Sequence, residues 1–174
     1  MNKMQDDKIT VDSMSSNDIE DILQKYSDQS WNKSRDIIEG YFEKQKNDDL
    51  YVFIAKYNDD LAGYTVLYKD TSVGPFANKG IPVINDLIVF EKFQRKGIGC
   101  HILDAAEQKA SEFNNCVQLA VGLHSGYGAA QRIYIKRGYV PDGSGVWYKD
   151  SPLDPYDDCQ NDDELVLYLI KNLS

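Results

Sequence analysis

The sequence contains little of what stabilises small secreted or metal-binding domains. Its three cysteines, Cys100, Cys116 and Cys159, are an odd number and lack the spacing of metal ligands, which argues against a disulfide framework and against a zinc site. No apolar run approaches the length needed to cross a bilayer, and the polar residues 1–8 lack the core of a signal peptide. We therefore expect a cytoplasmic protein with no bound metal and no membrane partner.

Positive charge is scarce as well. The 174 residues contain 19 Lys and Arg against 28 Asp and Glu, which gives a formal net charge of −9. This balance disfavours nucleic acid as a partner, because phosphate contacts need clustered cations. It favours a cationic substrate, although the same charge also serves solubility. The length and the ordinary composition, without an internal repeat or an interdomain linker, predict one soluble domain over residues 1–174.

The most informative segment is residues 83–99, an apolar strand that runs into a basic, glycine-containing turn. The strand, residues 83–90, is predicted to be largely buried. Its two polar residues, Asn85 and Asp86, therefore need partners, or a cleft where water or a ligand meets them. Gly97 and Gly99 then allow a ligand to approach the backbone without an intervening Cβ.

The helix predicted after this turn adds an anion site. Its first backbone N–H groups are unpaired and carry partial positive charge, and Arg95 and Lys96 add full charges beside them. Two other nucleotide motifs fit less well: a dinucleotide fingerprint needs Gly or Ala where Ile102 stands, and a P-loop needs a Gly-Lys-Ser/Thr that is absent. The alternative is a turn that merely caps an ordinary helix, whereas the motif predicts a pyrophosphate cradle.

Gln94-Arg95-Lys96-Gly97-Ile98-Gly99 matches the Q/R-x-x-G-x-G/A signature of the GNAT superfamily of acyl-CoA-dependent N-acetyltransferases, which the chain resembles. A second block, Ala130-x-x-x-Tyr134-x-x-Arg137-Gly138-Tyr139, resembles the element that follows the family's fifth strand, with Tyr139 in place of the usual Phe. The resemblance is clearest over residues 50–139. It implies that acetyl-CoA is the co-substrate and that an amine is the acceptor.

The expected order of elements suits the GNAT fold. We expect, in order, a strand at 8–12, a helix that starts at the N-cap Ser16, a helix at 34–46, hairpin strands at 50–56 and 61–68, the strand at 83–90, a helix at 97–113, a strand at 117–121, a helix at 129–136 and strands at 146–149 and 164–170. The resemblance implies a mixed α+β fold. In it, a mostly antiparallel central sheet is flanked by helices, and its central strands splay apart around the cofactor.

The phosphates of CoA are expected at the turn. The candidate groups are the backbone amides from Lys96 to Cys100 and the side chains of the three residues Gln94 to Lys96. The residues concerned are Gln94, Arg95, Lys96, Gly97, Ile98, Gly99 and Cys100. The resemblance places the pantetheine arm against main-chain groups near Leu87 and Val89. Seven residues before Tyr134 the family often has an Asn that holds the cofactor; this chain departs from the family there with Tyr127, which we expect to contact the cofactor instead.

Three residues are candidates for proton transfer. Tyr134 matches the family's general acid, whose phenol, with a pKa near ~10, protonates the departing thiolate; the alternative is a residue that only packs against its helix. Asp86 is a candidate general base that accepts the proton of the amine directly or through water, or it binds the substrate ammonium. The alternative is that neighbouring groups of the protein satisfy its carboxylate. Diamine acetyltransferases carry Glu-Asp here, and Asn85 replaces the Glu with an amide that cannot act as a base. His124, with a pKa near ~6.5, is the second candidate base, unless it is a surface histidine without a role.

The resemblance implies direct transfer in a ternary complex, since no cysteine matches a nucleophile position. We expect a small primary amine of amino-acid, polyamine or aminoglycoside type, with a slight preference for an amino acid, and with Trp31, Asn85 and Asp86 as contacts. Selectivity is expected from the segments 28–32, 71–80 and 152–163. A protein acetyltransferase acting on a lysine or an N-terminus and a catalytically silent CoA-binding module remain alternatives. The resemblance also admits a homodimer.

Overall fold

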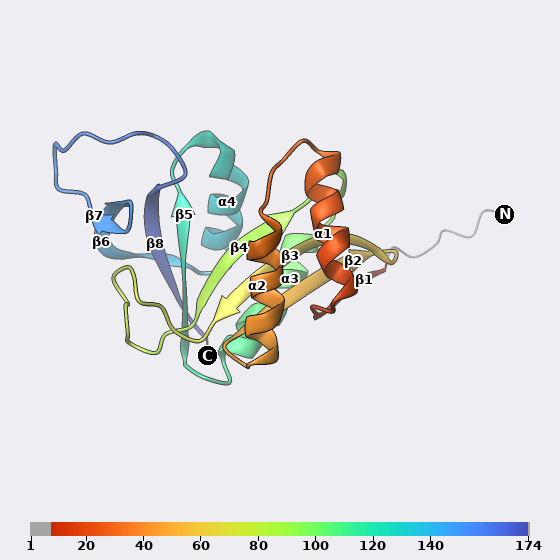
Figure 1. Cartoon of the computed structure of the whole chain (residues 1–174). Helices are drawn as coiled ribbons and strands as arrows, with labels where there is room; N and C mark the ends of the chain where they lie inside the picture. Colours follow the sequence, from red (N-terminus) through yellow and green to blue (C-terminus); the bar gives the residue numbers. More distant parts are fainter. Residues whose placement is uncertain (1–7, 174) are drawn as a thin grey trace. The chain divides into compact units, whose positions relative to one another are not determined.

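The computed structural model describes residues 8–173, so that residues 1–7, which include most of the polar start, lie outside the described part. The chain forms two compact units, shown in Figure 1. The first comprises Met1–Leu67 and Asp86–Gln108, and the second comprises Tyr68–Asn85 and Lys109–Ser174. Each unit is described by itself below.

The strands of the first unit follow the order β1-β2-β3-β4. They are β1 (Ile9–Ser13), β2 (Leu50–Tyr57), β3 (Asp60–Tyr68) and the later residues of β4 (Val83–Val89). β1 runs antiparallel to β2, with Ile9 opposite Tyr57. β2 and β3 form the predicted hairpin. Its turn residues Asn58 and Asp59 have φ of 50° and 66°, the left-handed pair whose twist matches that of a two-residue hairpin.

Helices lie on both faces of these strands. Figure 1 shows α1 (Asn17–Asp28) and α2 (Arg35–Lys46) in front of them and most of α3 (Ile98–Ala110) behind. Ser16 is the N-cap residue of α1 as predicted, but its side chain does not cap; instead the Asp18 carboxylate accepts the N–H and Oγ–H of Ser15, both at 2.7 Å. The aliphatic part of the unit's core includes Ile22, Ile38, Leu50, Ile54, Val66, Ile102 and Leu103, each at most 1% exposed.

The second unit contains the strand order β4-β5-β8-β6-β7. The strands after β4 are β5 (Cys116–Gly122), β6 (Val140–Tyr148), β7 (Ser151–Pro152) and β8 (Leu165–Asn172). β4 pairs with β5 in parallel, with Val83 opposite Gln118, and the remaining pairs are antiparallel. The short helix η2 (Ser125–Tyr127) and α4 (Gly128–Lys136) follow β5.

Most predicted elements are present, with two corrections. β4 is not largely buried: Ile84 is buried, but Asn85 is exposed and the other five residues are intermediate, so the polar pair lies in a half-open strand. β6 begins at Val140 rather than at 146. Its register shifts between Pro141 and Val146, where Gly143 and Gly145 have positive φ. This irregularity interrupts the alternation of apolar and polar residues, so the sequence pattern does not predict the first part of the strand. The mixed, mostly antiparallel fold class is confirmed. Among the described residues no helix is long and apolar enough to span a bilayer.

Candidate functional site

The basic turn of the first unit is a sharp reversal between η1 (Glu91–Phe93) and α3. Arg95 and Gly97 both have left-handed backbone conformations, with φ of 62° and 82°. A Cβ placed on Gly97 would meet nothing nearer than the His101 ring at 3.9 Å. The space in front of Gly97 is therefore open, which is what a ligand approaching the backbone requires.

The polar side chains of this turn differ in how they are held. The Gln94 amide donates to the Val89 carbonyl oxygen at 3.2 Å, and the Lys96 ammonium lies 4.8 Å from the centroid of the Tyr57 ring. Arg95 is exposed, and no hydrogen bond or ion pair within the described residues engages its guanidinium. Arg95 is thus the cation of the turn that a phosphate meets without displacing another contact.

The backbone amides of the turn are fewer than the sequence predicts. The N–H of Cys100 donates to the Gly97 carbonyl at 3.1 Å and that of His101 donates to the same oxygen at 3.2 Å, so Cys100 offers no free amide. The amides of Ile98 and Gly99, in the first turn of α3, have no intrahelical acceptor. His101 Nδ1 lies 3.0 Å from the same Gly97 oxygen and must carry the proton in that bond. Sequence reasoning missed His101, although its position four residues after Gly97 places it beside the turn.

These groups fit a pyrophosphate. The start of α3 supplies unpaired amides and partial positive charge, Arg95 supplies a full charge, and Gly97 leaves room for the oxygens. The donor set is therefore that of an anion site.

Asp86 lies in β4 with a left-handed φ of 50°. Its Oδ2 accepts from the Lys33 ammonium at 2.6 Å and from the Tyr41 hydroxyl at 2.7 Å. The side chains of Lys33 and Asp86 are 20% and 23% exposed, so the pair is mostly buried. The sequence correctly predicts that Asp86 needs a partner, but no local signal indicates Lys33, 53 residues earlier. No contact within the described residues engages Oδ1, which keeps its acceptor capacity.

Two further tyrosines of the first unit feel the charge of Asp86. The hydroxyls of Tyr26 and Tyr64 are 2.8 Å apart, and Tyr64 is fully buried. Burial, followed by the neighbouring Tyr26 and Asp86, raises the pKa of Tyr64, so its phenol keeps its proton. The predicted substrate contact Trp31 packs its ring 6.2 Å from that of Tyr26 and is 41% exposed.

Tyr134, in the second unit, is a buried residue of α4 with 6% exposure. Its ring centroid lies 5.7 Å from that of Tyr139. Burial, followed by the neighbouring Tyr127, raises the pKa of Tyr134 above its ordinary value. The phenol is therefore protonated at neutral pH and is suited to donate a proton rather than to accept one.

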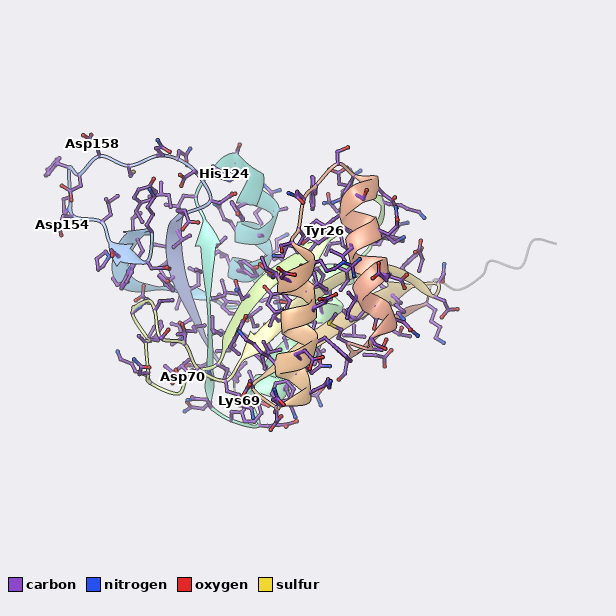
Figure 2. The ribbon with its side chains drawn as sticks, in the orientation of Figure 1. Tyr26, Lys69, Asp70, His124, Asp154 and Asp158 are labelled. Atoms are coloured by element: carbon purple, nitrogen blue, oxygen red, sulfur yellow. The ribbon has the colours of Figure 1, made fainter. Side chains whose placement is uncertain are left out.

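His124 has both ring nitrogens engaged. Nδ1 accepts the N–H of Gly126 at 3.0 Å, and so Nε2 carries the proton and lies 2.9 Å from Asp163 Oδ1. The Tyr127 hydroxyl donates to the same Asp163 oxygen at 2.9 Å. The hydrogen bonds from His124 and Tyr127 lower the pKa of Asp163. Because neutral His124 has no free lone pair, this arrangement disfavours it as a general base; Figure 2 shows its position before α4.

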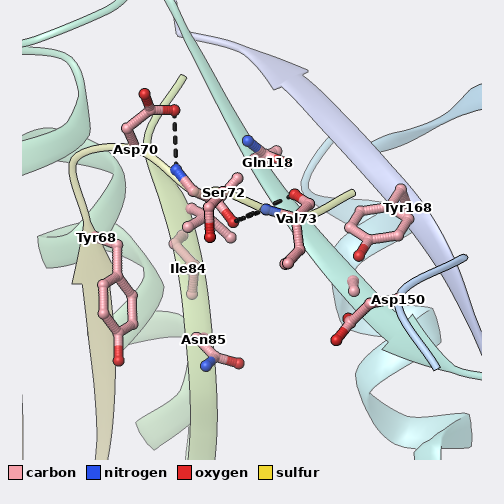
Figure 3. A pocket seen from close by; sticks show the side chains of 12 residues that line it. Tyr68, Asp70, Ser72, Val73, Ile84, Asn85, Gln118, Asp150 and Tyr168 are labelled. Carbon is pink, nitrogen blue, oxygen red and sulfur yellow. Dashed lines mark hydrogen bonds between the residues drawn. The ribbon is translucent and has the colours of Figure 1, made fainter. Parts of the chain in front are cut away.

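A cavity of about 380 Å³ lies within the second unit (Figure 3). Its wall includes Asn85 of β4, Gln118 of β5, Tyr168 of β8 and two carboxylates, Asp70 and Asp150. Asn85 was predicted as a substrate contact from its place in β4. The two aspartates were not, because they belong to a loop and a turn without a motif.

Comparison with known proteins decides the family. Residues 16–139 match the Acetyltransferase (GNAT) family. The chain belongs to the GNAT acetyltransferase family. A relative from Bacillus subtilis (strain 168), the uncharacterized N-acetyltransferase YhfO, is 31% identical over 104 residues, which are 59% of this chain and 67% of YhfO. This GNAT enzyme is accordingly an acetyltransferase, and acetyl-CoA is its co-substrate.

Solved structures support the same fold. A GNAT-family acetyltransferase from Desulfovibrio desulfuricans aligns with a TM-score of 0.71 at 12% identity over 96% of this chain and 100% of its own. The ribosomal-protein-S18-alanine N-acetyltransferase of Escherichia coli aligns at 0.67 and 13% identity, covering 96% and 95%. The yncA acetyltransferase of Salmonella typhimurium, solved with acetyl-CoA, aligns at 0.67 and 16% identity, covering 95% and 94%. At these identities the likeness shows the fold alone.

The predicted site residues of this GNAT enzyme divide between its units. The first unit holds the turn, Leu87, Val89, Asp86 and Trp31, and it adds Lys33 and Tyr41, which sequence reasoning missed. The second unit holds Asn85, His124, Tyr127 and Tyr134, and it brings His124 and Tyr127 together through Asp163. Among the described residues no three His, Cys, Asp or Glu side chains are grouped so that they could hold a metal ion, and the three cysteines are free.

Proposed function

We propose that this GNAT enzyme transfers the acetyl group of acetyl-CoA to a primary amine of a small molecule, directly and within a ternary complex. The cavity of the second unit carries the proposal. Its volume of about 380 Å³ lies in the range of small-molecule sites, roughly 300–1,000 Å³, and its wall mixes polar and apolar groups. We propose further that both units belong to one catalytic domain.

The turn of the first unit is proposed to bind the CoA phosphates. The Ile98 and Gly99 amides and the Arg95 guanidinium are the donors that other contacts leave available, and the open side of Gly97 admits the ligand. Main-chain groups near Leu87 and Val89 remain the proposed contacts of the pantetheine arm. Since the Val89 carbonyl already accepts from Gln94, the arm must share or replace that hydrogen bond.

The proposed chemistry needs two proton transfers. The amine nitrogen forms a bond to the thioester carbonyl carbon, the carbon–sulfur bond breaks, and the leaving thiolate takes a proton. Tyr134 is the proposed donor, because burial keeps its phenol protonated. The amine must lose a proton, and we propose that Asp86 accepts it, directly or through water, on Oδ1, the oxygen that Lys33 and Tyr41 leave available.

A screen of primary amines with acetyl-CoA and a thiol-reporting dye tests this function. We expect CoA release with at least one small amine and much less with peptides that expose an N-terminus or a lysine. Release with peptides alone would make the enzyme a protein acetyltransferase, as the Escherichia coli structure is by name. Binding of CoA without release in any arm would leave the silent-module alternative.

A further inference from the structure

The cavity of the second unit carries uncompensated negative charge. As far as the structure describes the chain, its wall contains two carboxylates, those of Asp70 and Asp150, and no Lys, Arg or His. Asp70 Oδ1 accepts the N–H of Thr71 at 2.8 Å, and no ion pair within the described part of the chain involves either carboxylate. Asp150 occupies the two-residue turn between β6 and β7, where it and Lys149 have φ of 60° and 50°. Figure 3 shows the side chains of Asp70 and Asp150 at the cavity.

A buried acceptor lies in the same wall. Gln118 is fully buried in β5, and its Nε2 donates to the Ile81 carbonyl at 3.1 Å. Its Oε1 is buried, and no group of residues 8–173 forms a hydrogen bond with it. An unmet buried oxygen costs free energy that a ligand N–H recovers. The cavity therefore combines two negative charges with an acceptor that still needs a donor.

Tyr168, another residue of the wall, is packed against the loop after β3 by a close approach that requires glycine. Gly74, in the loop after β3, has φ of 83°, and a Cβ there would lie 2.7 Å from ring atoms of Tyr168. The loop thus lies directly against Tyr168, which is 6% exposed. Burial, followed by the charges of Asp150 and Asp142, raises the pKa of Tyr168. Its hydroxyl stays neutral, so the wall adds no further charge.

We propose that this cavity binds the acceptor amine and that the acceptor carries at least two cationic nitrogens, as a diamine or polyamine does. Asp70 and Asp150 each attract one ammonium group, and a nitrogen-bound hydrogen is donated to Gln118 Oε1. This inference rests on the proposed function and names its substrate class. It departs from the preference for an amino acid, because a free carboxylate in this cavity faces two carboxylates and no cation.

Calorimetric titration of the full chain without acetyl-CoA tests the inference with three ligands of equal chain length: 1,5-diaminopentane, 1-aminopentane and 5-aminopentanoate. We expect the diamine to bind at least about tenfold more tightly than the monoamine, since its second ammonium group adds one charge-assisted contact with a cavity carboxylate. The zwitterion should bind most weakly. The advantage of the diamine should shrink in high salt, because both aspartates are exposed at the cavity.

The Asp70→Asn/Asp150→Asn double variant should lose the preference for the diamine. The control, Asp12→Asn/Asp21→Asn, removes the same charge from exposed positions of β1 and α1 and should keep it. Gln118→Met should weaken diamine binding several-fold in a protein that is folded by circular dichroism. Equal affinity for the diamine and the monoamine, or a preference that survives the Asp70/Asp150 variant, overturns the inference.

Failure of this inference can be told apart from failure of the proposed function. Absence of the diamine preference together with CoA release in the presence of monoamines overturns the polycation assignment alone. Diamine binding at the cavity without CoA release from acetyl-CoA supports the site and overturns the transferase activity.

Discussion

The candidate sites of the two units differ in the surroundings of their carboxylates. In the first unit Asp86 is mostly buried and already meets an ammonium, that of Lys33, at 2.6 Å. In the second unit Asp70 and Asp150 stand at a cavity with no ion pair within the described residues. In the first unit Asp86 thus has a cationic partner on one oxygen, and the basic turn keeps open donors, whereas the two cavity carboxylates of the second unit have no cationic partner within the described residues. A ligand with phosphates suits the first unit, and a cationic ligand suits the second.

The largest effect on catalysis is expected at Tyr134. If the second unit serves the chemistry, Tyr134→Phe should lower kcat by about 10²–10⁴-fold while the affinity for acetyl-CoA changes little. Steady-state kinetics and calorimetry measure the two. Because burial raises the pKa of Tyr134, its ionisation should cause no loss of kcat as the pH rises to its ordinary value near ~10.

Tyr139→Phe is the matched control, since it removes the hydroxyl of the neighbouring buried tyrosine and introduces the residue usual in the family. It should leave kcat within about twofold, well below the effect of a lost general acid. An unchanged kcat in Tyr134→Phe would assign that residue to packing.

The next largest effect is expected at the turn of the first unit. Gly97→Glu should weaken CoA binding by at least about tenfold, because it places a bulky negative group where the phosphates approach and disturbs contacts worth roughly 1.5–3 kcal/mol each. Gly143→Glu is its control: Gly143 also has a left-handed φ, 91°, and open space for a Cβ, but it lies in the second unit. Both variants therefore carry similar strain and charge. Equal loss of affinity in the two would mean that strain, and not the turn, controls binding.

The Lys33–Asp86 pair is expected to stabilise the folded first unit. Lys33→Met and Asp86→Asn each leave one partner of a mostly buried pair unmatched, and a double-mutant cycle should give a coupling free energy of about 0.5–3 kcal/mol. Asn tolerates the left-handed φ of Asp86, so the backbone is preserved. Urea unfolding measures the cycle.

The same variants test the proposed proton acceptor. Asp86→Asn should raise the KM for the acceptor or lower kcat, and CoA affinity should stay unchanged. If the effects of Lys33→Met and Asp86→Asn on the free energy of unfolding are additive, the pair contributes nothing to stability. If the kinetics of Asp86→Asn are unchanged, solvent and not Asp86 accepts the proton of the amine.

The smallest effect is expected at His124. His124→Gln keeps one acceptor and one donor, so it should preserve the contacts with Gly126 and Asp163 and leave the acidic limb of the pH–rate profile in place. Loss of that limb would instead make His124 the base. The pKa of Asp163 is lowered in the folded chain, so its stabilising contribution is present above the ordinary Asp pKa and is lost as the pH falls through the folded value. The stability difference between wild type and His124→Ala should therefore shrink in acid.

The sequence by itself determined the features that depend on neighbours in the chain. The turn from Gln94 to Gly99 could be predicted because its strand, glycines, cations and helix follow one another, and each constrains the backbone of the next. Tyr134 could be placed on a helix for the same reason, with Gly138 at φ 90° ending that helix as predicted.

Only the tertiary structure decided how the polar residues are paired. Asp86 pairs with Lys33, 53 residues away in the sequence, and His124 with Asp163, 39 residues away. The wall of the cavity is formed by residues of four strands together with a loop and a turn. No local pattern encodes such a partner, because it depends on which surfaces pack against each other once apolar groups are buried. The sequence therefore predicted the anion site, Tyr134 and Asp86, whereas the fold decided the partner of Asp86 and brought Asp70 and Asp150 to the cavity.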